Sequence, residues 1–144
     1  MTATAADGAC RQVGQLSISL PPGLNAPALA RRVAAGFLDG LWPPLAHARR
    51  DDVLLIVSEL VTNAITHASG PYALALRADA GAFDVAVVDG SDVAPAHRDP
   101  DMTEGTGGMG LHIAEDLGAH LFIEAFGGGK CVHATLAQSV GCGA

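Results

Sequence analysis

Glu59, Asn63 and His67 lie four residues apart in the apolar segment VSELVTNAITHA. In a helix this spacing places all three side chains on one face. A carboxylate or an amide is costly to bury without a partner, so these groups must meet either polar protein atoms or a ligand. An amide oxygen can ligate Mg²⁺, and a nearby carboxylate can accept a proton from an attacking hydroxyl. From this segment alone, a polar stripe that meets solvent or neighbouring loops is an equally good interpretation.

An aspartate and a glycine, Asp89 and Gly90, end the alternating segment FDVAVVDG. A carboxylate at the end of a strand can accept a hydrogen bond from an exocyclic amine, and the adjacent glycine lets a flat ring approach the backbone. The same dipeptide is a common turn sequence, and for this pair alone the turn is the stronger interpretation.

A glycine cluster opens the segment GTGGMGLHIAEDL, with glycines at 105, 107, 108 and 110. Such a backbone can curl around an anion, and the helix that follows would point its amide donors and positive dipole end at a phosphate. The spacing is not that of the lysine-containing phosphate loop, and no strand leads into it as a dinucleotide fingerprint requires. Taken alone, the cluster is weak evidence.

The elements that must position these residues follow from two periodicities, because alternation predicts strands and four-residue apolar spacing predicts helices. Helices are predicted from Asn25 to near Gly40, from Asp51 to Ala68, and over 108–119. The charge of Asp51 favours a helix N-terminus at that residue. Residues 90–107 form a polar connection whose length indicates a functional loop. Strands are predicted at 15–20, 72–78, 82–89, 120–126 and 131–137.

The order of these elements predicts an α/β (α+β) fold, a two-layer sandwich with its helices on one face. Neighbouring strands can pair as hairpins, which favours a mixed, mostly antiparallel sheet. A length of 144 residues suits one domain. We expect a lead-in at 1–13, a single domain at 14–138 and a tail at 139–144.

Composition excludes several classes of function. The net charge of −7 would repel a nucleic acid backbone. No apolar run reaches the roughly 18 residues that a membrane span needs, and no signal peptide is recognisable, so we expect a cytoplasmic location. The three cysteines, at 10, 131 and 142, show no CxxC or Cys/His spacing of a metal site and are expected to be reduced thiols.

The three segments occur in the order found in the GHKL, or Bergerat, ATP-binding fold. ELVTNAITHA resembles the N box of that family, VVDGS its adenine-contacting aspartate segment, and GGMGLHIAEDL its glycine-rich box behind the ATP lid. GGKCVHATL resembles its closing strand, so the resemblance runs from about Leu16 to Leu136. The short chain, without attached sensor or dimerisation domains, resembles the stand-alone anti-sigma-factor serine kinases.

The resemblance implies a role for each matching residue, with ATP and Mg²⁺ as cofactors. Asn63 would hold Mg²⁺, Glu59 would act as the general base or orient it, and Asp89, with Gly90 beside it, would recognise the adenine amine. His67 would have a structural role beneath the nucleotide. The phosphates would be wrapped by the backbone of Gly105, Gly107, Gly108, Met109, Gly110 and Leu111.

Some positions depart from the family pattern. Ser91 and Val93 stand where many members have glycines, which would narrow the adenine side of the pocket. Lys130, the single lysine of the chain, stands where many members have threonine, and we expect its side chain to point to solvent. Arg98, the single basic residue in the lid segment, is likewise expected to be solvated.

The resemblance leads to three functional hypotheses. The first is an ATP-dependent serine/threonine kinase that binds a sigma factor and phosphorylates an anti-sigma factor antagonist. The second is a catalytically silent, ATP-dependent module that sequesters a regulatory protein. The third, a detached histidine-kinase catalytic domain, is disfavoured because no dimerising helical pair precedes the fold. A homodimer through the edge of the first strand is a further expectation.

Overall fold

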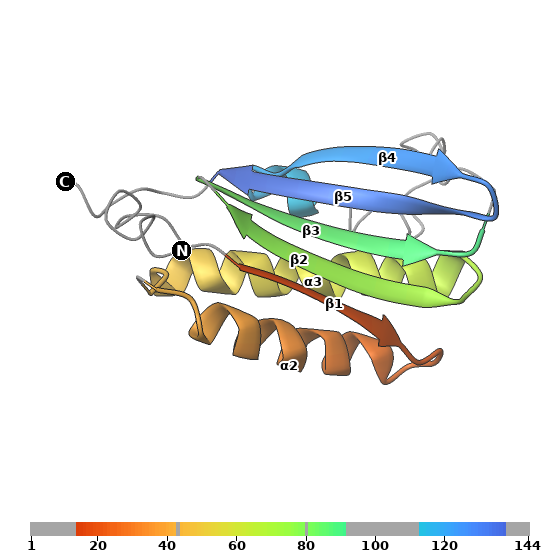
Figure 1. The fold of residues 1–144 in the computed structure, drawn as a ribbon, viewed down its shortest axis with the longest axis horizontal. Helices are drawn as coiled ribbons and strands as arrows, with labels where there is room; N and C mark the ends of the chain where they lie inside the picture. The colour runs from red at the N-terminus through yellow and green to blue at the C-terminus, as the bar shows by residue number, and fades with distance from the viewer. Residues whose placement is uncertain (1–13, 43, 80, 92–112, 138–144) are drawn as a thin grey trace.

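The fold is built from two layers, a sheet and a helical layer (Figure 1). A computed structural model describes residues 14–42, 44–79, 81–91 and 113–137. Its elements are β1 (Gly14–Leu20), α2 (Ala26–Asp39), α3 (His47–His67), β2 (Tyr72–Asp79), β3 (Ala82–Asp89), β4 (His120–Phe126) and β5 (Gly129–Ala137).

The five strands form one sheet in the order β1-β2-β3-β5-β4, and every neighbouring pair is antiparallel. Strands β2 and β3 form a hairpin, and so do β4 and β5, as expected. The tight turns use Gly81 and Gly128, whose positive φ angles of 93° and 91° suit glycine. The predicted α/β two-layer fold is therefore confirmed. Strand β1 lies at one edge of the sheet, while the homodimer through it stays a prediction.

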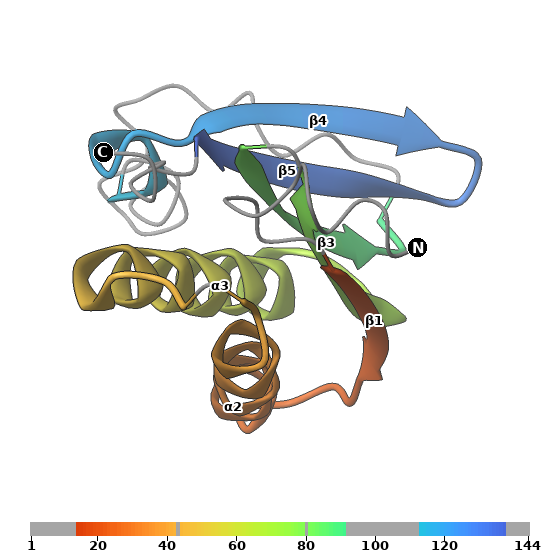
Figure 2. The same ribbon diagram turned by 60° about the vertical axis from the view of Figure 1, so that its left-hand side comes forward.

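Both long helices cover the same face of the sheet (Figure 2). Helix α3 packs against β2 and β3, and α2 packs against α3 and β1. Strands β5 and β4 therefore extend beyond the helices on the side away from α2. In the described part of the chain, no helix is both long and apolar enough to cross a membrane.

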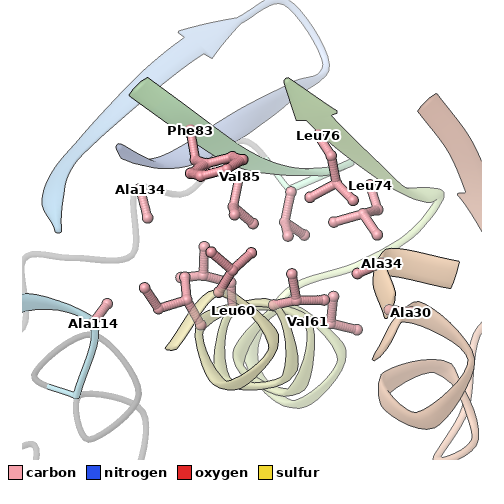
Figure 3. Packing of buried hydrophobic residues seen from close by; sticks show 14 of the residues in the cluster. Ala30, Ala34, Leu60, Val61, Leu74, Leu76, Phe83, Val85, Ala114 and Ala134 are labelled. Atoms are coloured by element: carbon pink, nitrogen blue, oxygen red, sulfur yellow. The ribbon is translucent and has the colours of Figure 1, made fainter. Parts of the chain in front are cut away.

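The core lies between the sheet and α3 (Figure 3). Side chains alternate between the two faces of a strand, so Phe83 and Val85 of β3 both point towards the helices. They meet Leu60 and Val61 of α3, and Leu74 of β2 adds to the same layer. These side chains are almost completely buried, and their removal from water is the main stabilising contribution to the fold.

Two predicted helices differ in extent from the helical segments that the structure describes. The prediction that the second helix begins at Asp51 was wrong, because α3 begins one turn earlier, at His47. Both arginines of this extra turn have partners: Arg50 Nε donates to Asp39 Oδ1 of α2 at 2.8 Å, and Arg49 forms an ion pair with Asp52. Of the helix predicted at 108–119, residues 113–116 are helical, and the part before residue 113 lies outside the described residues.

Candidate functional site

Glu59 and Asn63 lie on the flank of α3 that faces away from α2. Arg50 marks the opposite flank, because its side chain bonds to Asp39 of α2. At about 100° per residue, Asn63 lies roughly 140° and Glu59 about 180° around the axis from Arg50. Both side chains are half-buried. They point to the side on which β5 and β4 continue the sheet.

The polar atoms of these two side chains take no hydrogen bond from any residue that the structure describes. Within the described part of the chain, the hydrogen-bonding groups of Glu59 and Asn63 therefore have no protein partner and are available to solvent or a ligand. His67, one turn further on, is the last residue of α3 and has an exposed side chain. All three N-box residues therefore lie on one flank of the helix.

Asp89 is buried at the end of β3, with only 2 % of its surface exposed. Its Oδ1 atom accepts hydrogen bonds from Lys130 Nζ at 2.9 Å and from the backbone N–H of Ser91 at 2.8 Å. Oδ2 accepts none from the described residues. One carboxylate oxygen is thus held by the protein, and the other keeps its capacity to accept a hydrogen bond.

The expectation that Lys130 points to solvent was wrong, because this residue is only 4 % exposed. Lys130 lies directly opposite Asp89 in the β3–β5 register, so the two side chains share the inner face of the sheet. The signal was present in the sequence, since Lys130 precedes the inward-facing Val132 and Ala134 at two-residue spacing. A buried ammonium requires a charged partner, and Asp89 supplies it.

Gly90 joins the end of β3 to the end of α3. Its backbone N–H donates to the carbonyl of Ser69 at 2.7 Å, just after α3. A Cβ atom at position 90 would overlap the carbonyl oxygen of Gly70. Glycine at this position is therefore required by close backbone packing within the protein, a reason that differs from the expected approach of a flat ring. The same contact brings Asp89 to the C-terminal end of the N-box helix.

The inner face of β4 is partly exposed beside this site. Ile123 is 39 % exposed, although Val132, its partner on β5, is buried. Ala125, opposite Lys130, is exposed as well. This surface lies on the side of α3 to which Glu59 and Asn63 point.

The third segment of the expected site lies outside the described residues. This applies to Gly105, Gly107, Gly108, Met109, Gly110 and Leu111, and to Val93 and Arg98. The structure therefore brings together the N-box helix and the aspartate segment. The part of the glycine-rich segment in the site stays a prediction from the sequence.

Comparison with known families agrees with this arrangement. Residues 20–136 match the model of the histidine kinase-like ATPase domain. A search of curated proteins found no match to the chain. Because the match covers most of the sequence, the chain belongs to the family of histidine kinase-like ATPase domains, as the resemblance to GHKL proteins predicted. Membership in this family implies ATP binding and a kinase-like regulatory function.

Proposed function

We propose that this protein is an ATP-dependent serine/threonine kinase that resembles the anti-sigma-factor kinases and phosphorylates an anti-sigma factor antagonist. A sigma factor would be its second protein partner. The observation that carries the proposal is the half-buried pair Glu59 and Asn63, whose side chains take no hydrogen bond from the described protein. In an ATPase domain, such a pair would be available to a bound nucleotide, which supports the proposal.

In this proposal each residue has a distinct task. The amide oxygen of Asn63 is a hard donor of the kind that Mg²⁺ accepts, and no described residue competes for it. When bound, Mg²⁺ would neutralise charge on the phosphates of ATP. Glu59 would accept the proton of the attacking serine hydroxyl. Asp89 would receive the adenine amine on Oδ2, because Lys130 and Ser91 occupy Oδ1.

The phosphate-wrapping role proposed for the backbone from Gly105 to Leu111 rests on the sequence. Four glycines in six positions leave that backbone free to direct N–H groups at an anion. Residues 113–116, just after this segment, are helical, and a helix at that place in the sequence supports the proposal.

Thermal stability with and without Mg-ATP tests the site. A ligand that binds only the folded state raises the free energy of unfolding, by about 2.7 kcal/mol at a hundredfold excess over its dissociation constant. The midpoint temperature of unfolding rises as a result. We expect this shift in the intact chain and its loss in Asn63→Ala. Thr62→Ala is the matched control, because Thr62 is the exposed neighbour on the same helix. An unchanged shift in Asn63→Ala would contradict the assigned role.

A second candidate function is an ATP-dependent module that sequesters a regulatory protein without catalysis. The ion pair of Lys130 with Asp89 bears on both functions equally, because it occupies Oδ1 of the carboxylate that would recognise adenine. Glu59→Ala separates the two functions. The kinase predicts that phosphate transfer to a serine of the antagonist falls by about 10²–10⁴-fold while ATP still binds. The silent module predicts that partner binding and its regulation are unchanged by the same substitution.

A further inference from the structure

A second group of chemically active side chains lies on the outer face of the sheet, opposite the helices. Alternation along β5 turns Cys131 and His133 to this face, whereas Lys130 and Val132 face the helices. Glu124 of β4 is the register partner of Cys131. Directly opposite residues have Cβ atoms roughly 4.5–5.5 Å apart, which brings Glu124 to Cys131. His133 is opposite Phe122 and is therefore a diagonal neighbour of Glu124, within reach of its long side chain.

Their donor atoms form a compact set. One carboxylate oxygen of Glu124, the sulfur of Cys131 and one ring nitrogen of His133 all lie within 4.8 Å of one another. His133 Nε2 is 2.9 Å from Glu124 Oε1. The group thus offers one sulfur, one nitrogen and one oxygen donor, and small side-chain rotations would bring all three onto a single ion.

The imidazole of His133 is held in place by its surroundings. Its Nδ1 atom lies 3.1 Å from Asp84 Oδ2, and Thr135 donates its hydroxyl to Asp84 Oδ1 at 2.9 Å. The ring of Phe122 stacks on the imidazole at a centroid distance of 4.4 Å. A carboxylate on one ring nitrogen fixes the tautomer and leaves the other nitrogen as a ligand, as in histidines that bind zinc.

The charges around the group are those that attract a cation. Burial and the nearby carboxylates of Glu124, Asp84 and Asp89 raise the pKa of the Cys131 thiol to about 11. The thiol is therefore protonated near neutral pH in the metal-free protein. A bound divalent ion would favour the thiolate of Cys131 over the protonated thiol, because its charge stabilises the thiolate and neutralises the carboxylates.

We propose that Cys131 Sγ, His133 Nε2 and a carboxylate oxygen of Glu124 bind Zn²⁺, with water in the fourth position. A thiolate, an imidazole and a carboxylate form a donor set typical of zinc, and three protein ligands leave one tetrahedral position open. Binding replaces the S–H bond with a Zn–S bond and releases the proton to solvent. The site is separate from the proposed ATP site, because Asp89 and Lys130 lie on the inner face.

Zinc titration of the full-length, reduced, tag-free chain tests the proposal. Cys10→Ser and Cys142→Ser remove the other two thiols, so that Cys131 is the remaining one. Competition with a chromophoric chelator is expected to show one zinc ion bound per chain at micromolar zinc or below. Co²⁺ in place of Zn²⁺ should give a thiolate-to-cobalt absorption band that disappears in Cys131→Ser.

Two further variants test the proposal even if Cys131→Ser fails to fold. Asp84→Asn removes the carboxylate that positions His133 and one negative charge near Cys131, without removing a proposed ligand, and should weaken zinc binding about 10–100-fold. His120→Ala is the matched control, since this exposed histidine lies on β4 outside the group, and its affinity should equal that of the parent. Parent-like zinc affinity in both Cys131→Ser and Asp84→Asn would overturn the proposal. Absence of zinc binding in the parent would also overturn it, and would leave a simple network of ion pairs around His133.

Discussion

At the scale of single residues, the ion pair between Asp89 and Lys130 is the main departure from what the sequence suggested. Both side chains are almost fully removed from water. Taking two charges out of water costs several kcal/mol per ion, and their mutual attraction offsets this cost only while both are present. The pair thus makes one position of the candidate adenine site dependent on a residue 41 positions away in the sequence.

Replacement of Lys130 by methionine tests the energetics of this pair. Lys130→Met leaves the Asp89 carboxylate buried without its counter-charge, and we expect it to lower the free energy of unfolding by about 3–5 kcal/mol. Urea denaturation followed by circular dichroism measures the change.

The matched control is Arg49→Ala, which removes the more exposed ion pair with Asp52. That change should cost less than about 1 kcal/mol. If Lys130→Met costs no more than the control, the buried pair does not exist in solution.

At the scale of elements, the junction between α3 and β3 determines where the site residues meet. The helix ends at His67, the strand ends at Asp89, and Gly90 lies against the backbone that leaves the helix. No side chain fits between these two segments, because a Cβ at position 90 would overlap Gly70. Close backbone packing therefore fixes the position of Asp89 relative to the N-box helix.

Alanine substitutions at two glycines should have opposite effects on stability. Gly90→Ala forces the two backbones apart and should cost about 1–3 kcal/mol. Gly36 is a helical residue in the last turn of α2, where a Cβ would meet no atom within 4 Å, and Gly36→Ala should add up to about 0.5–1 kcal/mol. Thermal unfolding of both variants measures the difference, and a neutral Gly90→Ala would contradict the close approach of the backbones.

At the scale of the whole molecule, the sheet separates two kinds of chemistry. Its inner face packs on the core, carries the Asp89–Lys130 pair and is the face on which α3, with Asn63, lies. Its outer face carries the group around His133. Because side chains alternate, consecutive residues Lys130 and Cys131 belong to different faces. The side chains of the two sites therefore do not touch, and a substitution can alter one site without removing a contact of the other.

The fluorescence of the single tryptophan of the chain tests whether the surface around it is exposed in solution. Trp42 lies in the connection between α2 and α3 and is 78 % exposed. We expect its fluorescence to be close to that of tryptophan in water, to be quenched readily by iodide, and to change little on unfolding. A blue-shifted emission that iodide does not quench would mean that another segment or a second copy covers this surface, contrary to the structure.

The sequence by itself determined the elements and the class of protein. The two-residue alternation of FDVAVVD placed β3 at 82–89, and the N-box pattern placed Glu59 and Asn63 on one helical flank. These features are local, since they depend on the backbone geometry of one segment. The start of α3 was mispredicted, and the extra turn carries a contact that no local pattern shows, between Arg50 and Asp39 of the preceding helix.

Only the tertiary structure decided which side chains meet across segments. The pairing of Lys130 with Asp89, the contact of Gly90 with Gly70, and the group formed by Glu124, Cys131 and His133 all depend on strand register or backbone packing. A shift of one residue in register would turn every side chain of a strand to the other face. The burial of many apolar side chains at once selects the register, and no single motif in the sequence encodes it.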